Sequence, residues 1–507
     1  MSRVDRIALF LCFASLLVNA LLAARVFENI PHLEDEMTLV WQAQTISRGQ
    51  AVVPSPPASS AFLVPFVIDD QGFRFGKYPL GFPVLLSFGM RLGVRDWVNP
   101  AIAACALWLI YRLAKKLLDE PTALLALILT ATSPYYLIQS ANLLTHAWSL
   151  FLSSALALAW LDTFHPPSGA SNVPAWLTVA VAGLALGTLA LTRPYTALGV
   201  ALPFGLHGVL LLKNGPAAIR RGVLAIGLLA GGVATLHLLW QATLTGSLWI
   251  NPYTLWWPSD VIGFGPGTGF RPGGHTLPAG LSDALYGLLI ANHDLFGWPW
   301  LSFLFLPFGL LAGRRNPRAL MVSAVFPALV LLYLLYWVGA WVYGPRYYYE
   351  GLYSLTLLSA AGIAWVYRRL PLPRWRALVC RHPSPKALAS FAFTCGLALL
   401  FSANLLIYTP LRLGSLKGLY GSSASVLADF KQAAAQVPTP ALVIVHIGED
   451  WHAYAPLLEL SNPFLDSPYI FALSQGSQAD AALPGQFPGR AVFHHFPGLP
   501  NPAAPQP

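Results

Sequence analysis

Runs of roughly 20 apolar residues recur along most of this chain, separated by polar segments that carry the charges. A helix needs about 20 such residues to cross the hydrocarbon core of a bilayer, so the pattern predicts a polytopic α-helical membrane protein. We predict spans near 7–27, 98–113, 121–139, 143–163, 173–193, 196–212, 222–245, 298–313, 318–342, 352–367 and 388–408.

The first apolar run follows Arg3 and Arg6, as the core of a signal peptide would. No small-residue cleavage site precedes the acidic segment 34–36, and more spans follow. We therefore expect this run to be a retained first helix.

Two segments between spans are long. In 28–97, segment 37–49 has apolar residues at helical spacing and segment 79–92 is apolar but short, so both predict helices along the membrane surface. An additional span is the alternative for 79–92. Segment 246–297 is rich in Gly, Pro and Trp, which predicts an ordered but irregular outer loop. Such a loop could cover a site as a lid.

The end of the chain has a different pattern. It predicts a helix over 425–437, strands over 441–447, 469–473 and 490–494, and a Pro-rich disordered end. The predicted fold is an all-α polytopic membrane domain of about eleven helices over 1–411, followed by a small α/β outer domain over 412–507.

The composition agrees with a membrane protein, because 56% of the residues are hydrophobic and only 10% are charged. The net charge of +9 invites a nucleic-acid partner, but the basic residues cluster at the ends of spans, as the positive-inside rule predicts. Clusters near 112–116, 213–221, 314–318 and 368–386 fall on the side of the N-terminus, which we expect to be cytoplasmic. The four cysteines lie in or beside spans and predict neither a disulfide nor a metal site.

The 21 Asp and Glu residues avoid the middle of every predicted span. Ion-coupled transporters usually place ionisable residues at that depth. Eleven carboxylates lie instead in the outer loops before the tail: Glu28, Glu34, Asp35, Glu36, Asp69, Asp70, Asp96, Asp260, Asp283, Asp294 and Glu350. Any carboxylate chemistry is therefore expected outside. ATP and nucleotide sugars are cytoplasmic, so a lipid-linked donor is the alternative there.

Three outer segments carry candidate chemistry. Asp35 and Glu36 supply a carboxylate for general base catalysis. Lys77 precedes the predicted surface helix and is placed to meet a lipid phosphate, although a lysine that reaches the membrane surface is the commoner explanation. Arg346 lies among tyrosines, a pattern that fits phosphate and sugar binding and equally fits an aromatic belt.

Two further residues lie at outer span ends. His146 suits a metal ligand or a substrate contact, although a lone histidine there is more often structural. Arg193, in Thr-Arg-Pro-Tyr, is open to the same two interpretations.

In order and placement, these motifs resemble the GT-C superfamily of membrane glycosyltransferases, especially the protein O-mannosyltransferase and lipid A aminoarabinose transferase group. That group carries an Asp-Glu pair and then a Lys-Pro-Pro-Leu-Gly-like stretch. The corresponding segments here are Asp35-Glu36 and Lys77-Tyr78-Pro79-Leu80-Gly81, with a later Gly344-Pro345-Arg346-Tyr347. The resemblance covers about residues 1–410, most specifically 30–200.

The resemblance implies inverting transfer of a hexose or pentose from a polyprenyl-phosphate donor to an acceptor hydroxyl on a lipid, glycan or protein of the cell envelope. Asp35, with Glu36 as partner, would deprotonate the acceptor. Lys77, helped by Arg346, would stabilise the departing phosphate. Tyr78, Tyr347, His146 and Arg193 would contact substrate. The preceding Glu34 leaves the register of the base open.

Some members of the group hold a divalent metal beside the acidic pair, so a metal cofactor is left open, with His146 and Glu36 as conceivable ligands. Gly76 stands where some relatives carry an acidic residue, which argues against a metal site of that type.

Two other functions stay open. A transporter or flippase of lipid-linked sugars would share the aromatic and basic outer residues, and the missing mid-membrane charges count only against an ion-coupled form. A membrane assembly protein whose tail binds a partner is the third, and nothing in the spans favours it.

Overall fold

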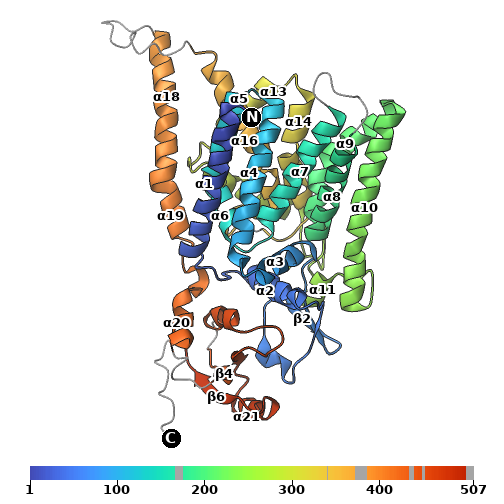
Figure 1. Ribbon diagram of the computed structural model, residues 1–507, viewed down its shortest axis with the longest axis vertical. Coiled ribbons are helices and arrows are strands. Elements are labelled where there is room, and N and C mark those ends of the chain that lie inside the picture. Colours follow the sequence, from blue (N-terminus) through green and yellow to red (C-terminus); the bar gives the residue numbers. More distant parts are fainter. Residues whose placement is uncertain (166–174, 340, 371–384, 433–438, 448–450, 498–507) are drawn as a thin grey trace.

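In a computed structural model, the chain is described over residues 1–165, 175–339, 341–370, 385–432, 439–447 and 451–497. The long helices stand side by side as a bundle, the shorter helices α2 (Glu34–Ser47), α3 (Gly81–Arg91) and α11 (Pro252–Trp256) lie beneath one end, and the strands of the tail lie beyond them (Figure 1). The N-terminus is at the opposite end of the bundle from the tail.

The first half of the bundle follows the predicted spans. It comprises α1 (Arg3–Arg25), α4 (Val98–Leu117), α7 (His146–Phe164), α8 (Trp176–Thr192), α9 (Pro194–Asn214) and α10 (Ala217–Thr245). The predicted span 121–139 is broken into α5 (Glu120–Ala131) and α6 (Pro134–Ala141), which meet at 58°. Pro134 causes the break, because proline has no N–H to donate and disfavours helical geometry in the residue before it.

The second half departs further from the prediction. The expected span 298–313 is helical only in α13 (Leu306–Gly313), and 318–342 contains two short helices, α14 (Pro317–Ser323) and α15 (Val325–Tyr333). The outer loop 246–297 is not irregular throughout, because it contains α12 (Leu277–Asp294), which the sequence analysis missed. Its signals were present: Thr276 caps the helix through its hydroxyl, and a proline occupies the first turn. The bundle is completed by α16 (Leu352–Tyr367), α18 (Pro385–Ala403) and α19 (Thr409–Gly414).

Six helices of the described residues are long and apolar enough to cross a membrane, or seven if α5 and α6 form one span. The chain is thus an integral membrane protein, but the predicted count of about eleven spans is not confirmed. Ion pairs place several charged loops at one end of the bundle. Lys115 Nζ, at the end of α4, lies 2.8 Å from Asp5 Oδ1 in α1, and Arg368 after α16 pairs with Asp119.

The first long loop contains the two helices expected there and a small antiparallel sheet. The sheet has the order β1-β3-β2 and consists of β1 (Val53–Pro54), β2 (Val67–Asp70) and β3 (Phe73–Gly76). Helix α2 begins at Glu34, so all three carboxylates of its acidic segment occupy the first turn, where the helix dipole favours negative charge.

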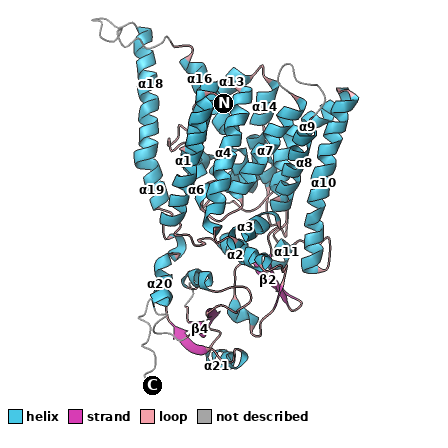
Figure 2. Cartoon of the chain, in the orientation of Figure 1, coloured by secondary structure: helices cyan, strands magenta, loops and turns pink. Residues whose placement is uncertain are grey.

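The tail contains the three strands expected from its sequence. They are β4 (Ala441–Val445), β5 (Tyr469–Leu473) and β6 (Ala491–His495), and they form a parallel sheet of order β5-β4-β6. Figure 2 shows strand β4 in magenta, at the end of the molecule away from the long helices. Helix α20 (Ala424–Gln432) precedes the sheet, and a short helix, α21 (Ser477–Ala482), lies between β5 and β6. Part of predicted helix 425–437 and the Pro-rich end lie outside the described residues.

The tail is attached to the first long loop by specific contacts. Arg95 Nη1 lies 2.7 Å from Glu459 Oε1, and the Glu28 carboxylate accepts the backbone N–H of Ala424 at 2.7 Å, at the start of α20. Ile30 is buried in the apolar core of the tail. The tail is therefore packed against the loop that carries the acidic segment.

Candidate active site

Asp35 lies in the first turn of α2 and is held by two neighbours. Its Oδ1 accepts a hydrogen bond from the Tyr78 hydroxyl, and its Oδ2 accepts from both terminal nitrogens of Arg346 at 3.3 Å. Burial raises the pKa of the Asp35 carboxyl, but the Arg346 guanidinium and the Tyr78 hydroxyl outweigh burial and hold the pKa below its ordinary value. Asp35 is therefore an ionised and oriented carboxylate at neutral pH, as a base for a hydroxyl proton requires.

Lys77 lies between β3 and α3, and its buried ammonium group sits among aromatic rings. Nζ is 3.6 Å from the ring centroid of Phe66 and 4.9 Å from those of Tyr253 and Trp257. Asp260 Oδ2 is 4.0 Å away, and within the described residues Nζ donates no hydrogen bond. Burial lowers the pKa of Lys77, while neighbouring carboxylates oppose the shift. The rings fix the cation in place and leave its donors available to an anion.

Two glycines fit the Lys77 segment into this position. A Cβ on Gly76 would lie 2.4 Å from Gln42 Cγ, and one on Gly81 would lie 2.2 Å from Thr192 Oγ1. Both positions are thus closed to any side chain. Gly76 stands where some members of the resembling group carry an acidic residue, and here the α2 side chain of Gln42 occupies that space.

Tyr347 separates two arginines. Its ring centroid is 5.9 Å from the Arg346 guanidinium carbon and 5.4 Å from that of Arg193, and the ring stacks on Tyr333 at 4.7 Å. The arginines come from distant segments, since Arg193 joins α8 to α9 and Arg346 begins a short helical turn, Arg346–Gly351. Together with Lys77 they place three cations around one aromatic-lined region.

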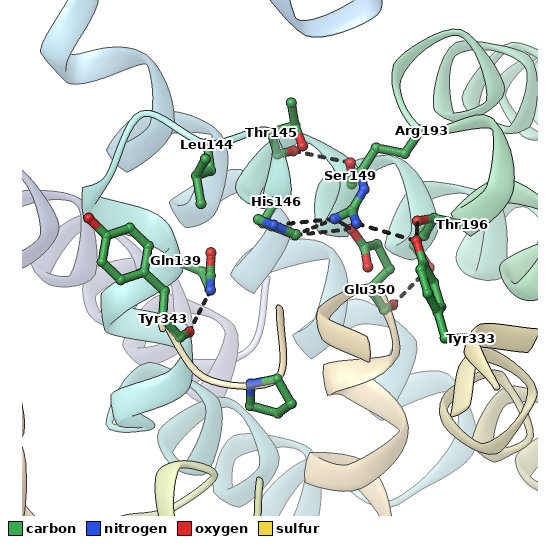
Figure 3. A network of polar contacts seen from close by, with 12 residues as sticks. Gln139, Leu144, Thr145, His146, Ser149, Arg193, Thr196, Tyr333, Tyr343 and Glu350 are labelled. Carbon is green, nitrogen blue, oxygen red and sulfur yellow. Dashed lines mark hydrogen bonds and ion pairs between the residues drawn. The ribbon is translucent and has the colours of Figure 1, made fainter. Parts of the chain in front are cut away.

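Arg193 is the centre of a buried polar network (Figure 3). Its Nη1 lies 2.9 Å from Glu350 Oε1 and also contacts the His146 ring. Its Nη2 lies 3.4 Å from the hydroxyl of Tyr333, which in turn hydrogen bonds Thr196 Oγ1 at 2.6 Å. Helices α7, α9 and α15 are thereby joined through one guanidinium group.

Glu350 is fully buried and has an unusual protonation equilibrium. Burial raises the pKa of its carboxyl to about 7, with Arg193 opposing the shift. Within the described residues, neither Glu350 Oε2 nor Arg346 Nε has a hydrogen-bond partner. Buried polar atoms are nearly always satisfied in folded proteins, so such unpaired atoms mark a place where a substrate can supply the missing partner.

Glu36 has a different environment from Asp35. Its Oε2 accepts the backbone N–H groups of His32 at 2.8 Å and Leu33 at 2.9 Å, and its Oε1 accepts that of Leu143 at 2.7 Å. The side chain is 1% exposed. The Tyr343 hydroxyl also donates to Oε2, at 3.4 Å. Both oxygens are thus occupied, mainly by backbone donors, and we interpret Glu36 as the residue that positions α2 against the segment before α7.

The conceivable metal ligands do not converge. The Glu36 oxygens bind backbone N–H groups, while the His146 ring faces Arg193 and Glu350. Across the described ranges, no three His, Cys, Asp or Glu side chains are grouped so that they could hold a metal ion. The described residues therefore do not fit a metal site of the type left open by the sequence.

The segment that carries Arg346 is anchored from the far end of the chain. Arg412, in α19, lies 3.1 Å from Asp294 Oδ1 through its Nε and donates to the backbone carbonyl of Val342 at 3.3 Å. Asp294 is 1% exposed and closes α12. Helices α12 and α19 therefore fix the approach to Arg346.

The structure thus brings the residues singled out in the sequence into one region. Contacts run from Tyr78 and Asp35 through Arg346 and Tyr347 to Arg193, and Lys77 lies within electrostatic reach of Asp35 and Arg346. His146 joins through Arg193.

Two carboxylates in this region received no role from the sequence. Asp260 lies beside Lys77 and accepts a hydrogen bond from the Tyr336 hydroxyl at 3.0 Å, and Glu350 pairs with Arg193. Both are among the eleven carboxylates that the sequence places in the outer loops, and this position was the signal that could have identified them.

Two solved structures of one protein, ArnT, have a similar fold. ArnT from Cupriavidus metallidurans bound to undecaprenyl phosphate matches with a TM-score of 0.56 at 13% identity, covering 96% of this chain and 88% of ArnT. The apo state of that ArnT matches with a TM-score of 0.57 at 14% identity, covering 95% of this chain and 88% of ArnT. The oligosaccharyltransferase AglB from Archaeoglobus fulgidus, in complex with an inhibitory peptide and a dolichol-phosphate, is more distant. Its TM-score is 0.48 at 14% identity, and the match covers 90% of this chain and 64% of AglB.

The sequence itself matches no protein-family model, and no curated protein is significantly similar to it. The likeness to ArnT therefore concerns the fold alone, and this fold agrees with the architecture expected from the resemblance.

Proposed function

We propose that this chain is a membrane glycosyltransferase that moves a hexose or pentose from a polyprenyl-phosphate donor to an acceptor hydroxyl on the extracytoplasmic side, with inversion at the anomeric carbon. The observation that supports this most directly is the pairing of an oriented, ionised carboxylate with a caged cation: Asp35 is held by Tyr78 and Arg346, and Lys77 lies within electrostatic reach of it. The fold shared with ArnT, which was solved with undecaprenyl phosphate bound, supports the choice of donor.

In this reaction Asp35 accepts the proton of the acceptor hydroxyl as the acceptor oxygen attacks the anomeric carbon. A new carbon–oxygen bond forms there while the bond from the anomeric carbon to the phosphate oxygen breaks. Negative charge then grows on the phosphate, and Lys77 stabilises it from inside a site with few competing acceptors. Arg346 keeps Asp35 oriented and adds positive charge, and Arg193 adds more across the Tyr347 ring.

The proposal extends to orientation in the membrane. The N-terminus and the basic loops paired near it would face the cytoplasm, because positively charged loops are retained on that side. Asp35, Lys77 and the tail would then face outward, where a lipid-linked sugar is the available donor.

The test uses purified protein in proteoliposomes that contain undecaprenyl-phosphate sugars with a radiolabelled hexose or pentose, together with an envelope extract as acceptor source. Transfer of label to the extract by the wild-type chain, and its loss in Asp35→Asn, is the expected result. Transfer that survives both Asp35→Asn and Lys77→Met would contradict the assignment. Translocation of the labelled lipid without transfer would indicate a flippase instead.

A further inference from the structure

The tail contributes aromatic residues close to the acidic segment of α2. The Tyr420 ring, in the turn Leu419–Gly421, stacks on the His452 ring with centroids 5.3 Å apart and an angle of 13° between the planes. Leu419 packs against the apolar cluster that contains Leu33 and Tyr343. This packing, together with the electrostatic interaction of His452 with Glu34, places the ring pair near the first turn of α2.

Tyr420 is held in a conformation that few side chains adopt. Its φ is 56°, in the left-handed region, and glycines with φ of 67° and 73° precede and follow it closely, at 418 and 421. A tyrosine in this region is under backbone strain, and such strain tends to occur at functional sites. The side chain is nevertheless 45% exposed, so the strain does not serve to bury the ring.

Glu34 interacts electrostatically with both His452 of this ring pair and the proposed base, Asp35. Its half-buried carboxylate is also within electrostatic reach of Lys77. Within the described residues, it forms no hydrogen bond or ion pair that would occupy its oxygens. An acceptor group is therefore available directly beside Asp35, in the same helical turn.

An aromatic face beside a carboxylate is suited to a sugar ring. The ring of a saccharide has an apolar C–H face that packs on an aromatic side chain, and its hydroxyls donate to a carboxylate in charge-assisted hydrogen bonds. Resting on the proposed function, we propose that Tyr420, His452 and Glu34 form the acceptor subsite and that the acceptor is a saccharide. Its ring stacks on Tyr420, and Glu34 holds one of its hydroxyls so that a neighbouring hydroxyl meets Asp35.

This inference gives the tail a role in the reaction, as the part of the chain that selects the acceptor. A lipid tail would not need the carboxylate, and an extended peptide would not need an isolated ring platform. The arrangement therefore favours a carbohydrate acceptor over the other two classes.

The experiment measures binding of free saccharides to the full-length chain in lipid nanodiscs by saturation-transfer NMR. The probes are disaccharides of glucose, galactose, mannose and N-acetylglucosamine, and a peptide that contains serine and threonine. We expect at least one disaccharide to bind the wild type. Tyr420→Ala and Glu34→Gln should each weaken that binding by about tenfold, the loss of one contact of ordinary strength, and Tyr420→Phe should retain it.

Tyr286→Ala is the matched control, because Tyr286 is 51% exposed on α12. Undecaprenyl phosphate binding, measured in parallel, should be unchanged in the Tyr420 variants. Three results would overturn the inference: no disaccharide binds the wild type, Tyr420→Ala binds as well as the wild type, or the peptide binds instead of the disaccharides. Failure of undecaprenyl phosphate to bind would count against the proposed function and not against this subsite.

Discussion

Arg346 donates to a single oxygen of Asp35 through both of its terminal nitrogens, each at 3.3 Å. The two residues are 311 positions apart in the chain, so their contact joins the first outer loop to the turn before α16. It leaves the other oxygen of Asp35 to Tyr78 and orients the carboxylate as a unit.

Replacement of Asp35 by Asn should abolish transfer while the protein remains folded. The amide keeps the shape of the side chain but cannot take up a proton, and general base catalysis typically contributes about 10²–10⁴-fold to a rate. The measurement is the initial rate of label transfer in proteoliposomes. Asp70→Asn, in β2 of the same loop, is the control and should transfer at the wild-type rate.

Lys77→Met should weaken binding of undecaprenyl phosphate, by roughly tenfold or more, because it removes the one ammonium group in the aromatic cage but keeps an unbranched apolar chain of similar length. Lys77→Arg should restore little, since the cage of Phe66, Tyr253 and Trp257 surrounds a compact cation and a guanidinium is larger. Binding of the lipid to protein in nanodiscs gives the dissociation constants. The exposed Lys417 provides the control variant, Lys417→Met. Equal affinities for wild type and Lys77→Met would remove Lys77 from the phosphate site.

Glu350→Gln should change how lipid-phosphate binding depends on pH. The Glu350 pKa is raised to about 7, so its carboxyl is neutral below that pH and ionised above it, where it offsets the charge of Arg193. Near pH 8 the variant should therefore bind undecaprenyl phosphate roughly three- to tenfold more tightly than wild type. The two affinities should converge below pH 6, where both side chains are neutral.

The ratio of the variant's affinity to that of the wild type at each pH cancels the effect of titrating the lipid phosphate, because both proteins bind the same lipid. Glu120→Gln, which alters an ion pair with Lys115 at the other end of the bundle, should give a ratio to wild type that does not vary with pH. A constant ratio for Glu350→Gln as well would exclude Glu350 from the electrostatics of the site.

Glu36→Gln should lower stability without removing the base. The amide cannot accept on both ends, so at least one of the N–H groups of His32, Leu33 and Leu143 loses its partner while buried. An unsatisfied buried donor costs about 1–3 kcal/mol, which should appear as a lower melting temperature in detergent. Activity per folded molecule should fall less than in Asp35→Asn. A Glu36→Gln variant with wild-type stability and no transfer would indicate that Glu36 has a catalytic role.

Local patterns predicted much of the architecture. Long apolar runs located the helices of the first half, and short apolar segments located the three strands of the tail. Prediction was weakest where a local signal competed with length. The run at 121–139 is apolar enough for one span, but Pro134 divides it, and the run at 298–313 yields only the short α13. Helix α12 was missed because glycine, proline and tryptophan dominate the loop around it.

The candidate site was predicted less completely. Its residue types and their order along the chain were visible, as were the outer carboxylates that include Asp260 and Glu350. The contacts of each group were not visible, because the partners are separated by 43 positions for Asp35 and Tyr78 and by 311 for Asp35 and Arg346, and their contact depends on how the helices pack.

The sequence by itself determined that the chain is a helical membrane protein with its carboxylates away from the middle of the predicted spans, because hydrophobic periodicity and the cost of burying charge act locally. Only the tertiary structure distinguished the three neighbouring acids of α2. Successive side chains on a helix point in different directions, so Glu36 meets backbone donors and Asp35 meets Tyr78 and Arg346, while Glu34 lies within electrostatic reach of His452 in the tail.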